Sequence, residues 1–141
     1  GPVTSVVWSP NEPGILVSAS SDNLLCVWEI DGSDYVQVMN SRFDQSLNSV
    51  AWGPDGQLAA CLWDGSIALF ASGETKPTIK PNVHEGSMVA AWTNDGRLVT
   101  GGVFDKTIKV WDSEVETPKP ILRGAVSGSK CMSVWPGEVG F

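Results

Sequence analysis

The sequence predicts an all-β chain: an array of about three four-stranded antiparallel units, followed by the first strand of a fourth. A short apolar, β-branched segment ending in tryptophan recurs about every 40 to 45 residues, at Trp8, Trp52, Trp92 and Trp135. In each unit an aspartate then precedes a second aromatic residue, giving the pairs Asp22–Trp28, Asp64–Phe70 and Asp105–Trp111. A repeat of this length is typical of units that cannot bury a core alone and pack on their neighbours.

The first unit shows how each element is predicted. We expect strands over 3–8, 15–19 and 24–30, and a weaker fourth strand over 35–39. The proline and glycine residues between 9 and 14 predict a loop, because proline removes a backbone donor and glycine permits positive φ. Asp22-Asn23 and Asp31-Gly32-Ser33 predict tight turns between the later strands.

The second and third units repeat this plan. Their expected strands cover 47–52, 57–61 and 66–71, then 88–92, 97–101 and 107–112. The looser segments 72–81 and 113–120 are each expected to hold an exposed fourth strand. No segment keeps a helical apolar spacing over three turns, so almost no helix is expected. The whole chain, 1–141, is therefore divided into units at about 3–40, 47–80 and 88–123, with an extra strand at 130–135.

Composition narrows the classes of partner. The net charge is −7, and the basic residues form no run, which argues against a nucleic-acid partner because phosphate contacts depend on lysine and arginine. No apolar segment approaches the ~20 residues needed to cross a bilayer, so no membrane insertion is expected. With one histidine in the chain, most metal and acid–base schemes are excluded, and we expect no metal and no cofactor.

The cysteines and the first residues bear on location and completeness. Cys26, Cys61 and Cys131 are odd in number, far apart and set in apolar stretches, which favours free buried thiols in a reducing, cytoplasmic setting over a disulfide or metal site. The chain begins Gly1-Pro2 with no initiator methionine or signal peptide. We therefore expect a piece of a longer protein.

The third unit is the most specific. The run RLVTGGVFDKTIKVWD at 97–112, with His84 upstream, resembles a unit of the WD-repeat β-propeller family. In that family a histidine, a serine or threonine, an aspartate and a tryptophan form a buried hydrogen-bonded tetrad within one blade. The resemblance assigns His84, Thr100, Asp105 and Trp111 to a full tetrad. It assigns Ser18, Asp22 and Trp28 to a partial one without histidine, and leaves Asp64 with Ala60 and Phe70 in the second blade.

Such a tetrad makes physical sense, since a buried carboxylate needs donors and imidazole, hydroxyl and indole groups supply them. The same residues could be read as a catalytic trio. However, the Thr100 hydroxyl is expected inside a strand and not in a cleft. No phosphate-binding glycine loop, zinc-protease motif or nucleophile elbow occurs. We therefore expect no enzyme.

Within the family, a narrower resemblance is found. Segments 13–22, 47–54, 64–69 and 100–111 are similar, in the same order, to the small propeller subunit of the COPII outer coat, which also serves in the nuclear-pore scaffold. This resemblance implies a role in ER–Golgi vesicle transport or the nuclear pore, with association to a membrane coat or the nuclear envelope. That subunit is an open propeller completed by a partner's blade. The present chain lacks the blades before Val3 and after Trp135.

Three blades and one strand would form an incomplete ring. Uncovered strand edges and apolar faces are an aggregation hazard. We therefore expect missing blades, another chain or self-association to complete the ring.

A partner-binding surface is expected at the turn between the second and third strands of each blade. The residues just before the three aspartates are Ser21, Trp63 and Phe104. Aromatic residues dominate interface hot spots, which favours Trp63 and Phe104 as anchors. The alternative is that both rings pack between blades. Ser46 and Ser87, which lead into first strands, are weaker candidates on the same face.

These observations predict a non-catalytic protein–protein interaction scaffold. The alternative is a peptide- or substrate-recognition adaptor module of a larger enzyme complex.

Overall fold

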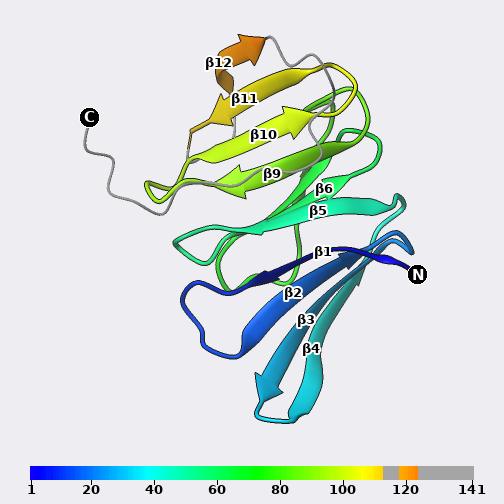
Figure 1. The fold of residues 1–141 in the computed structure, drawn as a ribbon, viewed down its shortest axis with the longest axis vertical. Helices are drawn as coiled ribbons and strands as arrows, with labels where there is room; N and C mark the ends of the chain where they lie inside the picture. The colour runs from blue at the N-terminus through cyan, green and yellow to red at the C-terminus, as the bar shows by residue number, and fades with distance from the viewer. Residues whose placement is uncertain (113–117, 124–141) are drawn as a thin grey trace.

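The structure is a computed structural model that describes residues 1–112 and 118–123 (Figure 1). Within these residues every regular element is a β-strand, and the strands form three four-stranded sheets in which all pairs are antiparallel. The all-β prediction of three four-stranded units is confirmed. The strand expected at 130–135, together with Trp135 and Cys131, lies outside the described residues.

The first sheet contains β1 (Val3–Trp8), β2 (Ile15–Ser20), β3 (Leu24–Asp31) and β4 (Asp34–Arg42), paired in that order. The prediction of a weak fourth strand over 35–39 was too short: β4 has nine residues. The reason is the hairpin at Asp31–Asp34, where Gly32 adopts a φ of 60°, and pairing continues from there to Leu24 opposite Arg42.

The other two sheets follow the same order. The second contains β5 (Leu47–Trp52), β6 (Leu58–Leu62), β7 (Ile67–Phe70) and β8 (Thr78–Lys80). The third contains β9 (Met88–Trp92), β10 (Leu98–Gly102), β11 (Thr107–Trp111) and β12 (Pro118–Arg123). The predicted strand ends are close to these bounds, with two exceptions. One is β4, and the other is β12, which begins within the predicted segment 113–120 and ends beyond it.

The connections fall on two opposite ends of the sheets. We call the end that carries the β2–β3, β6–β7 and β10–β11 turns the turn face, and the end that carries the β1–β2, β5–β6 and β9–β10 connections the loop face. In Figure 1 the turn face is on the right and the loop face on the left. Since neighbouring strands are antiparallel, the β3–β4 and β7–β8 connections also lie on the loop face.

The apolar core lies between neighbouring sheets. One cluster joins Val17, Ala19 and Leu25 of the first sheet to Leu58, Ala60 and Phe70 of the second. The other joins Ala59, Cys61 and Ile67 of the second sheet to Met88, Trp92, Leu98 and Trp111 of the third. Alternate residues of β6 enter the two clusters, so this strand is buried on both faces, as the repeat argument requires.

A β-bulge in the first strand of the sheet couples each of the first two sheets to the next. The register shifts between Val3 and Ser5 in β1, and between Leu47 and Ser49 in β5. The bulged Thr4 donates its hydroxyl to the Leu47 carbonyl (2.9 Å), and the bulged Asn48 donates its amide to the Met88 carbonyl (2.8 Å). A bulge re-aims one side chain, and here it supplies the hydrogen bond between sheets. The β9–β10 pairing has no such shift.

Candidate partner-binding surface

A chain of hydrogen bonds runs through the third sheet beneath its β10–β11 turn. Trp111 Nε1 donates to Thr100 Oγ1 (2.9 Å), and Thr100 Oγ1 lies 2.8 Å from His84 Nε2. His84 Nδ1 lies 2.7 Å from the Asp105 carboxylate. The structure thus brings together the four side chains assigned to the full tetrad.

The directions of these bonds follow from the groups involved. A carboxylate only accepts, so His84 donates through Nδ1; the Nε2 lone pair then accepts from Thr100, whose oxygen accepts from Trp111. Burial lowers the pKa of His84, against the opposing effect of Asp105, which fits a neutral ring. Burial acts to raise the pKa of Asp105, but hydrogen bonds from His84 and Thr107 together bring it below its ordinary value.

The three repeat aspartates share a different function from the tetrad. One carboxylate oxygen of each accepts a hydrogen bond from the backbone amide two residues later, at Leu24, Ser66 and Thr107. This bond closes the turn before the third strand of the sheet. The repeat aspartate is therefore first a turn residue.

Only part of the tetrad occurs in the first sheet. There the Trp28 indole donates to Ser18 Oγ (2.9 Å), while Asp22 instead pairs with the Gly1 amino group. In the second sheet Asp64 lies exposed at its turn, and Phe70 is buried in the core.

The trio of His84, Thr100 and Asp105 has no access for a substrate. The His84 side chain and Thr100 are both 0% exposed. In the described part of the chain, no group of three or more potential ligand side chains could hold a metal ion. No helix there is long and apolar enough to cross a membrane. The buried network therefore stabilises the blade and holds the turn above it.

Above that turn, two aromatic rings stand on the turn face. Trp63 is 53% exposed and Phe104 is 58% exposed. Their ring centroids are 6.4 Å apart at an interplanar angle of 80°, an edge-to-face pair. The two interpretations drawn from the sequence are thus combined, since the rings pack on each other across neighbouring sheets and each still presents about half of its surface.

The pair forms because the third sheet has an extra residue at this turn. Trp63 N donates to Ser46 O, but in the third sheet it is Val103 N, not Phe104 N, that donates to Ser87 O. Phe104 therefore lies one residue further along the turn, next to Trp63. Gly86 lies against its ring: with a φ of 67°, a Cβ at this position would lie 2.8 Å from Phe104.

A cavity of about 380 Å³ opens beside this pair. It is lined by Thr4, Asn48, Trp63, Ser87 and Val103. Ser87 lies in this wall but is only 3% exposed. Ser21 and Ser46 are half-buried, and the Ser46 hydroxyl donates to the Ser21 carbonyl (2.8 Å). Among the sequence candidates, only the two aromatic residues offer a large contact area.

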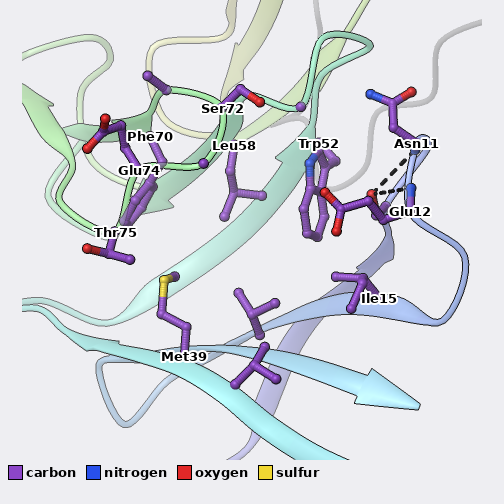
Figure 2. Close-up of a pocket in the computed structure, with 16 residues that line it drawn as sticks. Asn11, Glu12, Ile15, Met39, Trp52, Leu58, Phe70, Ser72, Glu74 and Thr75 are labelled. Atoms are coloured by element: carbon purple, nitrogen blue, oxygen red, sulfur yellow. Dashed lines mark hydrogen bonds between the residues drawn. The ribbon is translucent and has the colours of Figure 1, made fainter. Parts of the chain in front are cut away.

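A second pocket, which the sequence did not indicate, lies on the loop face between the first and second sheets (Figure 2). Its volume is about 340 Å³, and its lining includes Glu12, Ile15, Met39, Trp52, Leu58 and Glu74. These residues come from two loops and four strands, so no local sequence motif marks the site.

Comparison with a family model covers most of the chain. The model of the WD domain, G-beta repeat, matches residues 1–29, 35–70 and 76–112. Each match contains the first three strands of one sheet, and the second and third matches also contain the fourth strand of the sheet before.

Curated relatives show the same repeat. WD repeat-containing protein AAC3 of Dictyostelium discoideum is 29% identical over 70% of this chain and 21% of its own length. The ribosome biogenesis protein WDR12 homolog of Drosophila persimilis is 28% identical over 89% of this chain and 37% of its own length. The peroxisomal targeting signal 2 receptor of Schizosaccharomyces pombe is 40% identical over 48% of this chain and 24% of its own length. The chain thus spans well under half the length of these relatives.

A solved structure shows the same fold. The crystal structure of RRP9 WD40 repeats superposes with a TM-score of 0.76 at 15% identity, over 89% of this chain and 40% of that one. The three sheets are thus blades of an incomplete propeller.

Proposed function

Because the chain belongs to the WD40 family, the WD domain with G-beta repeats, we propose that it is a non-catalytic scaffold that binds another protein through its turn face. The observation that carries this proposal is the half-exposed Trp63–Phe104 pair beside a cavity of about 380 Å³. Exposed aromatic anchors next to a pocket are what interface hot spots require.

The test compares two double variants. Trp63→Ala/Phe104→Ala removes the pair, while Thr78→Ala/Ile79→Ala truncates two exposed side chains of β8 in the second blade. Proteins captured by the tagged wild-type chain are identified by mass spectrometry. Loss of a partner in the first variant, with retention in the second, supports the turn face. Equal capture by both variants contradicts it.

The proposal includes completion of the ring. Four of the exposed large apolar residues lie on the face of the first blade that is turned away from the second: Val3, Val6, Trp8 and Tyr35. A neighbouring blade would cover such a surface, whether it belongs to the same polypeptide, another chain or a second copy. The mass of the 141-residue chain in solution, measured by light scattering, tests the last of these cases. A dimer or trimer indicates that the copies cover each other, and a monomer excludes this.

The narrower assignments remain part of the proposal. A vesicle-coat or nuclear-pore scaffold rests on the sequence resemblance alone, and none of the relatives named above carries such a description. Two of them instead are a ribosome biogenesis protein and a peroxisomal targeting signal receptor. A cytoplasmic location is supported by the free thiols of Cys26 and Cys61 among the described residues. The absence of nucleic acid as a partner rests on the net charge of −7.

A peptide-recognition adaptor is the second candidate function. It is favoured by the size of the turn-face cavity, which suits a few side chains and not a folded domain. Capture of a short linear segment would distinguish it from a scaffold with an extended interface. Limited proteolysis of the captured partner, followed by rebinding of its fragments, makes this distinction.

A further inference from the structure

The pocket on the loop face is formed by side chains from two blades. Ile15, Val27 and Met39 come from the first blade, and Trp52, Leu58 and Phe70 from the second. The β1–β2 loop and the segment after β7 form its rim. It lies at the opposite end of the sheets from Trp63 and Phe104, so a ligand bound here leaves the turn face open.

The loops around the pocket are held in place by hydrogen bonds. The Ser9 hydroxyl accepts from the amides of Asn11 (3.4 Å) and Glu12 (3.1 Å), the bonds drawn as dashed lines in Figure 2. Asn11 Nδ2 donates to the Pro54 carbonyl (2.7 Å), which joins this loop to the β5–β6 loop of the next blade. A rim fixed before binding reduces the entropy cost of binding.

The chemistry of the walls is divided. The floor is apolar, with Leu58 and Phe70 buried and Met39 half-buried. Figure 2 shows Glu12 beside the Trp52 ring on one side and Glu74 on the other. Among the lining residues described there is no lysine, arginine or histidine. Both glutamates are exposed, so each carboxylate remains available to a ligand.

We propose that this pocket is a second recognition site, which binds a short peptide segment of a partner protein that presents an arginine or lysine next to a leucine-sized side chain. The aliphatic side chain fills the floor between Met39 and Leu58, and the cationic head lies between Glu12 and Glu74. A volume of about 340 Å³ is at the small end of ligand pockets and accommodates one or two side chains. The two carboxylates and the net charge of −7 favour an occupant with a positive charge.

The test uses fluorescein-labelled pentapeptides and the whole chain, with binding followed by fluorescence polarisation. The peptides are Ser-Leu-Arg-Leu-Ser, its Glu-centred analogue Ser-Leu-Glu-Leu-Ser, and Ser-Ser-Arg-Ser-Ser without the apolar side chains. We expect the first to bind about tenfold tighter than either of the others, because each lacks one of the two recognised features. Added salt should weaken binding of the first peptide and strengthen binding of the second, because it screens attraction and repulsion alike.

Charge reversal makes the test specific to this pocket. Glu12→Lys/Glu74→Lys should reverse the preference, so that the Glu-centred peptide becomes the tighter ligand. Both positions are exposed, so the fold is expected to tolerate the change, which a thermal melt checks. The matched control is Asp44→Lys/Glu85→Lys, which makes the same charge change at exposed positions toward the turn face and should keep the wild-type preference.

Three results would overturn the proposal: no binding of the Arg-centred peptide at millimolar concentration, equal affinity for all three peptides, or the same reversal in the control. The turn-face test has separate outcomes, because Trp63→Ala/Phe104→Ala should leave the peptide preference unchanged.

Discussion

Thr100→Val is the substitution that best isolates the hydrogen-bonded chain of the third blade. Valine has almost the same shape as threonine, so the fully buried site is not left with a cavity. What is lost is one hydroxyl with two partners: the Trp111 indole at 2.9 Å and the His84 imidazole at 2.8 Å. Both partners then remain buried with an unsatisfied polar atom.

The expected magnitude follows from those two groups. An unsatisfied buried donor or acceptor costs about 1–3 kcal/mol, so two such groups should reduce the free energy of unfolding by about 2–6 kcal/mol. With a urea m-value of about 2 kcal/mol/M, the midpoint should fall by roughly 1–3 M. Tryptophan fluorescence during urea unfolding measures the change, and the m-value should not move.

The first blade provides the control. Ser18→Ala removes the equivalent hydroxyl, which accepts only the Trp28 indole at 2.9 Å. Trp28 is half-buried and water can replace the lost partner, so we expect a loss of about 1 kcal/mol or less. If Thr100→Val costs no more than Ser18→Ala, the chain through His84 adds nothing to stability and the reasoning is refuted.

Three further predictions concern titration, backbone and thiol chemistry. The pKa of His84 is below its ordinary value of 6.5 in the folded chain, so the unfolded chain binds the proton more readily and stability should fall from pH 7 to pH 5. The lowered pKa of Asp105 should add a further loss only near and below pH 4. Urea titrations should show the decline from pH 7 to pH 5 in the wild type and a flatter profile in His84→Gln, and a flat wild-type profile would contradict it. Gly65→Ala should reduce the free energy of unfolding by more than about 2 kcal/mol, because φ is +86° and the new Cβ would lie 1.9 Å from a backbone oxygen. Gly73→Ala is the control in the same assay. Its φ is +76° but the new Cβ lies in open space, so only the backbone cost of about 1 kcal/mol is expected. Burial strongly raises the pKa of the Cys61 thiol, so it should resist alkylation until the chain unfolds, as peptide mass mapping would show; fast labelling of the native chain would contradict its burial.

The strand plan could be predicted because its signals are local. A β-branched run ending in tryptophan, followed by a turn rich in aspartate and glycine, marks the strands of each blade without knowledge of distant contacts. The tetrad of the third blade was assigned from the family resemblance. The spacing of His84 from Asp105 alone does not show that their side chains meet.

The features that were missed depend on register or on distant loops. Nothing in the sequence distinguishes bulged Thr4 and Asn48 from ordinary strand residues, because a bulge is defined only by the opposite strand. The loop-face pocket joins Glu12 to Glu74, which are far apart in the chain. The position of Phe104 depends on one extra residue in the β10–β11 turn. Alignment of the units on their aspartates hides this residue, because Trp63 and Phe104 both directly precede an aspartate.

The bulges in β1 and β5 give the array a direction. Thr4 and Asn48 each reach forward to a carbonyl of the following blade, whereas β9 has no bulge and so has no residue in this position. A blade docking after the third would meet a junction without the donor that secures the first two. Cooperative coupling should therefore differ between junctions. It should be strong between the first and second blades and between the second and third, whereas at the next junction it depends on the hydrogen-bonding groups of the incoming blade. In a nearest-neighbour description of unfolding, that junction has a coupling constant of its own.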